Sequence, residues 1–524
     1  MRLTKTNQLA MGVILLMTWA IPVLGSDLDL IGLSLLRQTN PTLQGAGVDV
    51  VQAEGTIGGI PPSFEVNPAA VGQPVTLLTY ISSNGMANTF PNLVGMESIH
   101  ADAVAANFFG ITGMAPQINH VNNYEADYFF NQLISNQISI SGKVVNQSFI
   151  FDNLTLPEQQ SVDSAYDNYA ARYNTLFISG AGNGINTGNG GFINAPATCY
   201  NGMGVGVSDG LTSIGTTRDN GRSKPDIVAP GLATSFSTPY VAGAATILFQ
   251  AALRGDGGAG TAVAAGNIQT VKSLLLNGAI KPLDWTNGIS TPLDARYGAG
   301  IVNIFNSHHQ LTGGKHLPVE TVGVPVGGSH FPGNNLNNIS SLAGWNFATI
   351  LSSRTQDKID HYYFNLTNAS DYTLTATLVW NRQNNQTAIN DLDFFLYDRS
   401  SNLVASSVSA VDNTEHIFLA RLAPGRYDLQ VLKNGGLTKR ITGSESYALA
   451  FEFFTISLNL ARSGNGLDIS WPIAPAGFIL QSTANLNPLM VWSDVINPII
   501  VTNNQNRVTL DSSSGNQFFR LRRP

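Results

Sequence analysis

Residues 221–243 read GRSKPDIVAPGLATSFSTPYVAG, and this stretch tells more about the fold than any other part of the chain. Ser235 follows a short loop and opens a run of small residues, which predicts the start of a closely packed helix. We expect Pro239 to lie in the first helical turn, where its missing N–H costs nothing. A serine at a helix N-terminus lies in a positive field beside backbone donors, which suits a nucleophile.

Two adjoining segments of this stretch resemble signatures of the subtilisin-like serine peptidases. The segment ATSFSTP around Ser235 is similar to the family's nucleophile motif, G-T-S-M-A-x-P, and KPDIVAPG is similar to a second family signature. A serine that only caps a structural helix is the alternative for Ser235 taken alone. The resemblance implies instead that Ser235 is the nucleophile of a peptidase.

The resemblance also requires a base and an acid earlier in the chain. His100 in MESIHADAVAANFFG matches the family's H-G-T-x-V-A segment and is implied as the general base, whereas we interpret His120 as an ordinary loop or strand-end histidine. Glu54 ends the strand-like segment GAGVDVVQAEG, where the family has aspartate. Its carboxylate can still orient the imidazole and stabilise the imidazolium. Asp49 and Asp102 are the competing acids.

Two further segments match the family in the expected order. Asn183, in SGAGNG, corresponds to the asparagine of the family's A-A-G-N segment, which implies an oxyanion donor; an ordinary turn is the alternative. VVNQSFI resembles the family's strand that pairs with the substrate backbone. The resemblance implies substrate contacts for residues of both segments, namely Ser148, Phe149, Ile150, Gly180, Ala181 and Gly182.

Departures from the family leave three functions open. Ala233 replaces the usual glycine, a hairpin before it is absent, and Phe149-Ile150 should narrow the entrance to the specificity pocket. The leading prediction is a secreted serine endopeptidase that acts on protein or peptide substrates and requires no cofactor for catalysis. A catalytically silent subtilisin-fold protein with a binding or adhesion role is the first alternative. A related acid peptidase with a Ser/Glu/Asp triad is the second, and His100 and Asn183 disfavour it.

Composition and the N-terminus indicate an exported protein. Residues 1–25 contain Arg2, Lys5 and an apolar run followed by small residues, which predicts a signal peptide. After its removal we expect a secreted, periplasmic or cell-surface monomer that has no membrane contact. The net charge of −7 argues against a nucleic-acid partner. The single cysteine, Cys199, excludes an intrachain disulfide.

The character of the sequence changes near residue 315. Before it, strand-like and helical runs alternate, which predicts an α/β fold with a doubly wound parallel sheet over residues 26–315. Beyond it, short alternating runs predict an antiparallel, jelly-roll-like β-sandwich over 316–455 and a small β module over 456–524, similar to domains that follow bacterial secreted peptidases. We expect a chain that ends near Leu317 to fold alone; the alternative is dependence on the β-sandwich.

Two groups of residues raise the question of metal binding. Asn390, Asp391 and Asp393 offer oxygen ligands within four residues, which suits a structural Ca²⁺, although a solvated acidic turn is the alternative. We interpret the histidines at positions 308, 309 and 316 as interdomain surface residues, since no matched carboxylate or cysteine spacing accompanies them.

Overall fold

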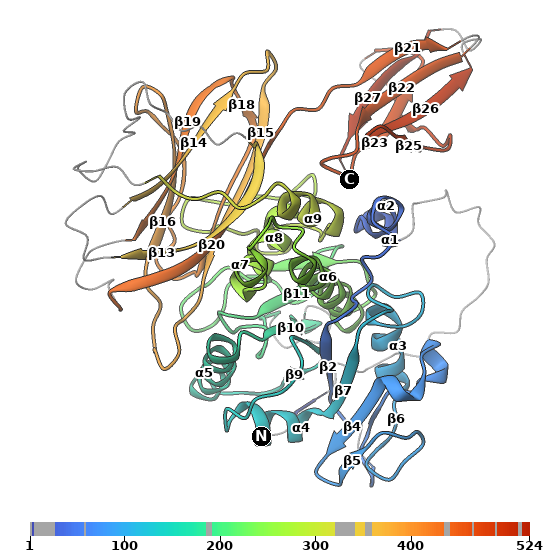
Figure 1. Ribbon diagram of the computed structural model, residues 1–524, viewed down its shortest axis with the longest axis vertical. Coiled ribbons are helices and arrows are strands. Elements are labelled where there is room, and N and C mark those ends of the chain that lie inside the picture. Colours follow the sequence, from blue (N-terminus) through green and yellow to red (C-terminus); the bar gives the residue numbers. More distant parts are fainter. Residues whose placement is uncertain are drawn as a thin grey trace.

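Three regions follow one another along the chain in the computed structural model (Figure 1). They are an α/β region (residues 27–319), a two-sheet region (341–456) and a C-terminal module (459–523). The structure describes residues 3–4, 27–56, 59–184, 191–319, 341–351, 359–433, 441–463, 466–487, 490–511 and 516–523. The predicted signal peptide lies outside the described residues, except for the backbone of β1 (Leu3–Thr4).

The α/β region is built on an eight-stranded sheet. Its strands in spatial order are β12 (Ile227–Ala229), β11 (Met203–Val207), β10 (Leu176–Gly180), β8 (Val144–Gln147), β2 (Asp49–Glu54), β7 (His120–Glu125), β4 (Leu78–Ser82) and β5 (Gly85–Ala87). Only the edge pair β4–β5 is antiparallel; all other neighbours run parallel. The prediction of a parallel α/β sheet is therefore confirmed.

Helices cover both faces of this sheet. Phe177 of β10 packs against Tyr166 of α5, with ring centroids 4.9 Å apart. Gly180 of the same strand lies close to Thr234 of α6. Because side chains alternate between faces along a strand, α5 and α6 lie on opposite sides. The helices are α1 (Asp27–Leu30), α2 (Leu33–Thr39), α3 (Ile99–Phe108), α4 (Ala126–Tyr128), the π-helix η3 (Phe129–Ile134), α5 (Leu156–Tyr173), α6 (Thr234–Arg254), α7 (Ala262–Ala265), α8 (Ile268–Gly278) and α9 (Ile304–Thr312).

Smaller elements lie between β2 and α3. They are the parallel pair β3 (Ser63–Glu65) and β6 (Met96–Glu97) and the two 3₁₀ turns η1 (Ala69–Val71) and η2 (Val75–Leu77). Together with β4 and β5 they form the part of the molecule at the bottom right of Figure 1.

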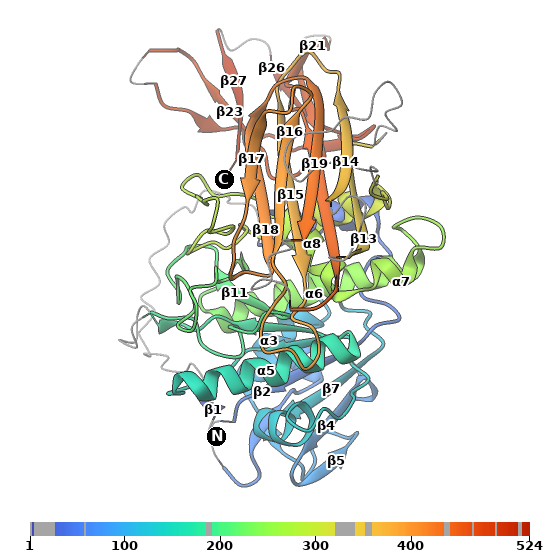
Figure 2. The ribbon, with the colours of Figure 1, turned by 90° about the vertical axis from the view of Figure 1, so that its left-hand side faces the viewer.

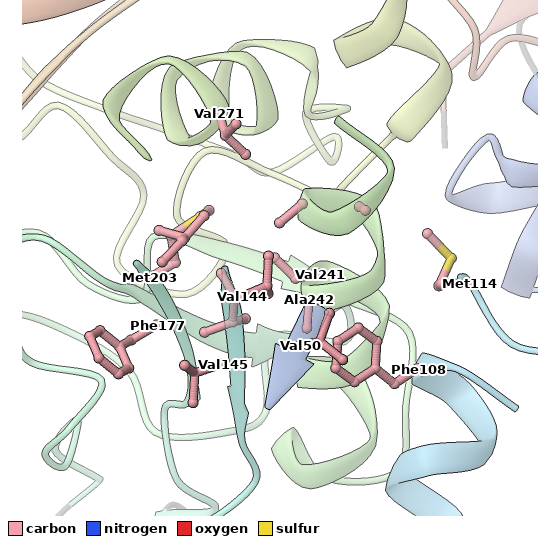
Figure 3. Packing of buried hydrophobic residues seen from close by; sticks show 14 of the residues in the cluster. Val50, Phe108, Met114, Val144, Val145, Phe177, Met203, Val241, Ala242 and Val271 are labelled. Carbon is pink, nitrogen blue, oxygen red and sulfur yellow. The ribbon is translucent and has the colours of Figure 1, made fainter. Parts of the chain in front are cut away.

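α6 is the central helix of the α/β region. In Figure 3, Val241 and Ala242 of α6 lie between the strands and Phe108 of α3. Gly243 on the same helix lets the chain at Met114 approach closely, because a Cβ at this glycine would lie 2.2 Å from that of Met114. Among the described residues α6 is the one helix long and apolar enough to cross a membrane, and 89% of that stretch is buried inside the protein.

The two-sheet region consists of two four-stranded antiparallel sheets that share one buried hydrophobic cluster (Figure 2). The first has the order β13 (Ala343–Leu351), β20 (Ser444–Phe454), β15 (Tyr372–Trp380) and β18 (Thr414–Leu422). The second has the order β14 (Ile359–Leu366), β19 (Gly425–Lys433), β16 (Leu392–Asp398) and β17 (Leu403–Ser407). The prediction of antiparallel structure beyond the α/β region is confirmed.

The α/β core continues into the two-sheet region. Trp345 of β13 is fully buried, belongs to the same hydrophobic cluster as the α/β sheet, and donates its indole N–H to the Leu311 carbonyl at 3.0 Å. Every residue of α8 is buried, and this helix packs against α6 as well as β15 and β20. Asn277 of α8 accepts hydrogen bonds from Thr375 and Thr377 of β15 at 2.9 and 3.0 Å. The two regions therefore share one core.

The C-terminal module contributes less to that core. Its sheets are β21 (Asn459–Ser463), β22 (Gly466–Pro472), β26 (Gln505–Asp511) and β25 (Ile500–Thr502), and then β24 (Ser493–Asp494), β23 (Ile479–Thr483) and β27 (Phe518–Arg522). A small hydrophobic cluster around Trp471 fills it, and the backbone N–H of Ala476 donates to Asn306 of α9 at 2.7 Å.

Candidate active site

Three strand ends and one helix start meet at one edge of the sheet. β2 ends at Glu54, β8 ends one residue before Ser148, and β10 ends three residues before Asn183. Because parallel strands place their carboxyl ends at the same edge, these residues converge there. The hydroxyl of Ser148 donates to the carbonyl of Ser235 at 2.9 Å, so the N-terminus of α6 lies at this edge too.

Glu54 and His100 form a buried pair. His100 Nδ1 lies 2.8 Å from Glu54 Oε2, and the two residues are 8% and 0% exposed. His100 is the second residue of α3, whose N-cap Ser98 accepts from the N–H of Ala101. Gln52, two residues before Glu54, donates from one amide nitrogen to Glu54 Oε1 at 3.0 Å and to the Ala101 carbonyl at 2.9 Å. Gln52 thus ties the carboxylate to the helix that carries the histidine.

The competing acids have other partners. Asp49 lies at the opposite end of β2, where it accepts from Asn119 at 2.5 Å. Asp102 accepts from the backbone N–H of Asn67 at 2.6 Å, and burial raises the pKa of Asp102 to about 6. The contact with His100 is made by Glu54, although glutamate is one methylene longer than the family's aspartate.

Ser235 lies in the first turn of α6 and is only 3% exposed. The ring of the next residue, Phe236, lies 6.0 Å from the His100 ring between centroids, which brings the imidazole beside this turn. The prediction for Pro239 is wrong in detail, because the helix already begins at Thr234 and the proline lies inside it. A proline cannot donate to the carbonyl four residues earlier. That carbonyl belongs to Ser235 and accepts the Ser148 hydroxyl instead.

Asn183 is fixed by Thr234. Its amide oxygen accepts from the Thr234 backbone N–H at 3.0 Å and from the Thr234 hydroxyl at 3.2 Å. The NH₂ group of this amide makes neither of these two bonds, so it can serve as the donor that an oxyanion hole requires. Gly182 beside it has φ +103°, a conformation that favours glycine.

The segment after β8 forms a strand edge. β9 (Ile150–Phe151) pairs antiparallel with the backbone of β1, which shows that this edge accepts an extended chain. Phe149 and Ile150 are 1% and 8% exposed. The predicted substrate residues of the two segments thus lie on adjacent elements, because β8 and β10 pair directly.

The calcium hypothesis stays a prediction. Asn390 is engaged: its amide oxygen accepts from Lys433 and from the N–H groups of Ile441 and Thr442, and its amide nitrogen donates to Glu445. Within the described parts of the chain, no three His, Cys, Asp or Glu side chains come close enough to hold a metal ion.

Sequence reasoning missed Gln52 and Thr234 as members of this site. Gln52 appears in the sequence only as a polar interruption of an apolar strand, and such an interruption in a buried strand is the signal that could have found it. Thr234 belongs to the recognised motif, but its bond to Asn183 is visible only in the structure.

Comparison with known proteins assigns a family to part of the chain. Residues 103–300 match the sequence model of the subtilase family, peptidase family S8. This segment belongs to the subtilases, and the protein is a serine peptidase, a hydrolase. Asn183 and Ser235 lie inside the matched segment, whereas Glu54 and His100 precede it.

Solved structures of proteases resemble parts of the chain at low identity. The protease domain of PatA is 20% identical, with 52% of this chain and 98% of that chain covered and a TM-score of 0.35. A lanthipeptide protease is 16% identical, with 54% and 94% covered and a TM-score of 0.36. No curated protein sequence gives a significant match.

Proposed function

We propose that the protein hydrolyses peptide bonds with Ser235 as nucleophile, His100 as general base and Glu54 as the acid that orients it. The observation that carries the proposal is the buried 2.8 Å contact between His100 Nδ1 and Glu54 beside the first turn of α6. A carboxylate on Nδ1 fixes the tautomer in which Nε2 is free to accept a proton.

In the proposed reaction these residues act in the following order. Ser235 Oγ attacks the substrate carbonyl carbon while His100 Nε2 takes the hydroxyl proton. The negative charge that develops on the carbonyl oxygen is stabilised by the Asn183 NH₂ group and the N-terminal backbone N–H groups of α6. His100 then gives its proton to the leaving amine, and a water molecule repeats the sequence on the acyl-enzyme. Glu54 orients the imidazole throughout.

Labelling with a serine-reactive fluorophosphonate tests the proposal directly. The full-length protein is expected to react, and Ser235→Ala or His100→Ala is expected to abolish the reaction. Ser83→Ala, which changes an exposed serine, is the matched control and should label normally. Absence of labelling in the folded wild-type protein would favour the catalytically silent alternative, and persistent labelling of Ser235→Ala would show that another residue reacts.

Export and the role of the β regions belong to the same proposal. The N-terminal residues carry the pattern of a signal peptide, so we expect the enzyme to act outside the cytoplasm on protein or peptide substrates. We take the two-sheet region for a β-sandwich that supports the active domain, because its buried side chains continue the α/β core. N-terminal sequencing of the mature protein tests the export proposal.

A further inference from the structure

A cavity of about 140 Å³ lies beside the strand edge that leads away from Ser235. Phe151 of β9, three residues after Ser148, forms part of its wall, and the Phe151 N–H donates to the carbonyl of Ala195 at 2.8 Å. The neighbouring Asn194 also lines it and donates its backbone N–H to Ala181 at 3.2 Å. The cavity thus lies next to both predicted substrate segments, through the chain neighbour Phe151 and through the bond from Asn194 to Ala181, although its wall contains no residue of either segment. Its size is close to the ~150 Å³ that accommodates one benzene molecule in an engineered protein cavity.

One wall of the cavity holds an unused hydrogen-bond donor. Gln159 of α5 lines the cavity and is 3% exposed, and its amide nitrogen Nε2 is buried without a hydrogen-bond partner. A buried donor without an acceptor costs free energy, so such groups are rare in folded proteins. A ligand that brings an acceptor oxygen into the cavity would remove this cost.

The charged residues of the cavity favour an anionic ligand. Arg218 lines it and makes one long hydrogen bond, 3.3 Å from Nη1 to the Leu154 carbonyl, which leaves most of its N–H donors for other groups. Asp152 also lines the cavity, but its two oxygens accept from the backbone N–H and the amide of Asn153, at 3.0 and 2.9 Å. Asp152 is thus engaged with its neighbour, whereas the cationic Arg218 and the Gln159 amide nitrogen offer N–H donors to a ligand.

We infer that this cavity receives a carboxylate side chain, Glu or Asp, of the peptide substrate, held by Arg218 and Gln159. The inference rests on the proposed peptidase function. Because β9 accepts an antiparallel chain and Ser148 lies beside the nucleophile, a substrate strand on this edge runs with its scissile bond near Ser148. The residue beside Phe151 then lies among the four residues that precede the scissile bond.

Peptide cleavage by the full-length protein measures the preference. A set of peptides carries Glu, Asp, Gln, Lys or Leu at each of the four positions before the scissile bond. At one of these positions kcat/KM is expected to be about tenfold or more higher for an acidic residue than for Gln or Lys, the usual effect of a hydrogen bond to a charged group. The preference should weaken at high salt, since Arg218 is exposed.

Two variants assign the preference to these side chains. Arg218→Leu should remove the advantage of the acidic peptide over Gln, whereas Arg421→Leu, which removes an exposed arginine of the two-sheet region, should not. Gln159→Leu should lower kcat/KM for the acidic and the Gln peptides by similar factors. It should also raise the melting temperature, because the unpaired donor is gone. An unchanged preference in Arg218→Leu would overturn the inference.

Binding to Ser235→Ala separates this inference from the proposed catalysis. Fluorescence anisotropy of labelled acidic and Gln peptides should show the same ratio of affinities, and Arg218→Leu in this background should remove it. If the wild-type protein is labelled by fluorophosphonate and cleaves peptides without an acidic preference, the inference is wrong and the peptidase function stands. If labelling fails but Ser235→Ala binds acidic peptides through Arg218, the cavity is assigned and the catalytic proposal is wrong.

Discussion

At the scale of single residues, the pair Glu54–His100 shows how the site tolerates a glutamate in place of the family's aspartate. The Glu54 carboxylate accepts a hydrogen bond from Gln52, which also donates to a backbone carbonyl of α3. The position of the acid and that of the histidine are therefore set by the same amide group.

The first prediction concerns this acid. Glu54→Gln keeps the shape but cannot stabilise the imidazolium and can select the wrong tautomer of His100, so kcat should fall steeply, by about 10⁴-fold. Steady-state kinetics on a peptide substrate measure it. Asp49→Asn is the matched control and should be mild, because Asp49 lies at the other end of β2. A large loss of kcat in Asp49→Asn together with a small loss in Glu54→Gln would mean that the acid is misassigned.

The second prediction concerns Asn183. Its NH₂ group acts on charge that exists only in the transition state, so Asn183→Ala should lower kcat by roughly 10²–10³-fold and leave KM nearly unchanged. Thr234→Val should give a smaller loss in the same direction, since it removes one of the two donors that fix the amide oxygen. Asn136→Ala, at an exposed position, serves as the control. A loss confined to KM would show that Asn183 only contacts bound substrate.

At the scale of elements, the close approach of α6 to the chain at Met114 sets a limit on side-chain size. A helix interior ordinarily favours alanine over glycine by about 1 kcal/mol. At Gly243 the added methyl would lie 2.2 Å from Met114 Cβ, so Gly243→Ala should destabilise the protein by about 1–3 kcal/mol. The double variant Gly243→Ala/Met114→Gly should show a favourable coupling energy in chemical denaturation. Additive effects would contradict the predicted clash.

Some elements of the α/β region can be predicted from the sequence, and others cannot. Local patterns predict the strand that contains β2 and the small-residue start of α6, and the resemblance to the family predicts β8. β7 is not predicted, because its sequence HVNNYE has no strand pattern. Its buried Asn123 is satisfied only in the folded protein, where it accepts from the Val66 N–H and donates to the Gln52 carbonyl. β7 is therefore stabilised by hydrogen bonds to residues far away in the sequence.

The residues of the candidate site also fall into two groups, those that the sequence predicts and those that only the structure shows. Glu54, His100, Asn183 and Ser235 each lie in a short segment with a recognisable pattern, and the structure brings the strand ends and the start of α6 that carry them together. Gln52 bonds to α3, 49 residues further along the chain, so the local pattern can mark it as an unusual polar residue but cannot identify its partner. The sharing of one core by two regions is also invisible locally, because polar residues such as Gln269 and Lys272 predict an exposed face for α8, whereas all its residues are buried.

At the scale of the whole molecule, the junction between the α/β and two-sheet regions contains an unusual buried lysine. Lys281 is 6% exposed, and its ammonium lies 5.1 Å from the Trp285 ring and 5.6 Å from the Phe418 ring. Its hydrogen bond in the described structure is a long one, 3.4 Å to the Ala279 carbonyl. Burial, and to a smaller extent the charge of Arg523, lowers the pKa of Lys281 well below 10.5.

The fourth prediction follows from the sign of this shift. Above pH 10.5 the lysine is neutral in both the folded and the unfolded chain, whereas below it the unfolded chain binds the proton more tightly. Stability is therefore lost as the pH falls from about 10.5 towards the folded pKa. Lys281→Met should raise stability at pH 7 by about 1–3 kcal/mol, and the gain should shrink towards pH 10. Melting curves measure it, with the half-buried Lys315→Met as control. A gain independent of pH would contradict the assignment.

The last prediction concerns the division of the chain near Leu317. The change of periodicity there suggested an independent α/β domain, but the structure favours dependence on the two-sheet region. A chain that ends at this point would uncover α8 and remove the fully buried Trp345 from the α/β core. It would also leave Asn277 without Thr375 and Thr377, and Gln310 without Glu452.

We therefore expect the chain truncated after Leu317 to be insoluble, or to melt about 10 °C or more below the full-length protein, as the loss of several kcal/mol implies. Truncation after Thr455 is the matched control. It removes only the C-terminal module, whose described contacts to the α/β region include one hydrogen bond to Asn306 and the packing of Ile473 and Ala476. The chain truncated after Thr455 should remain folded and still react with fluorophosphonate at Ser235. Solubility, cooperative melting and labelling decide between the two views, and a soluble, labelled chain ending at Leu317 would show that the α/β region needs no partner for its core.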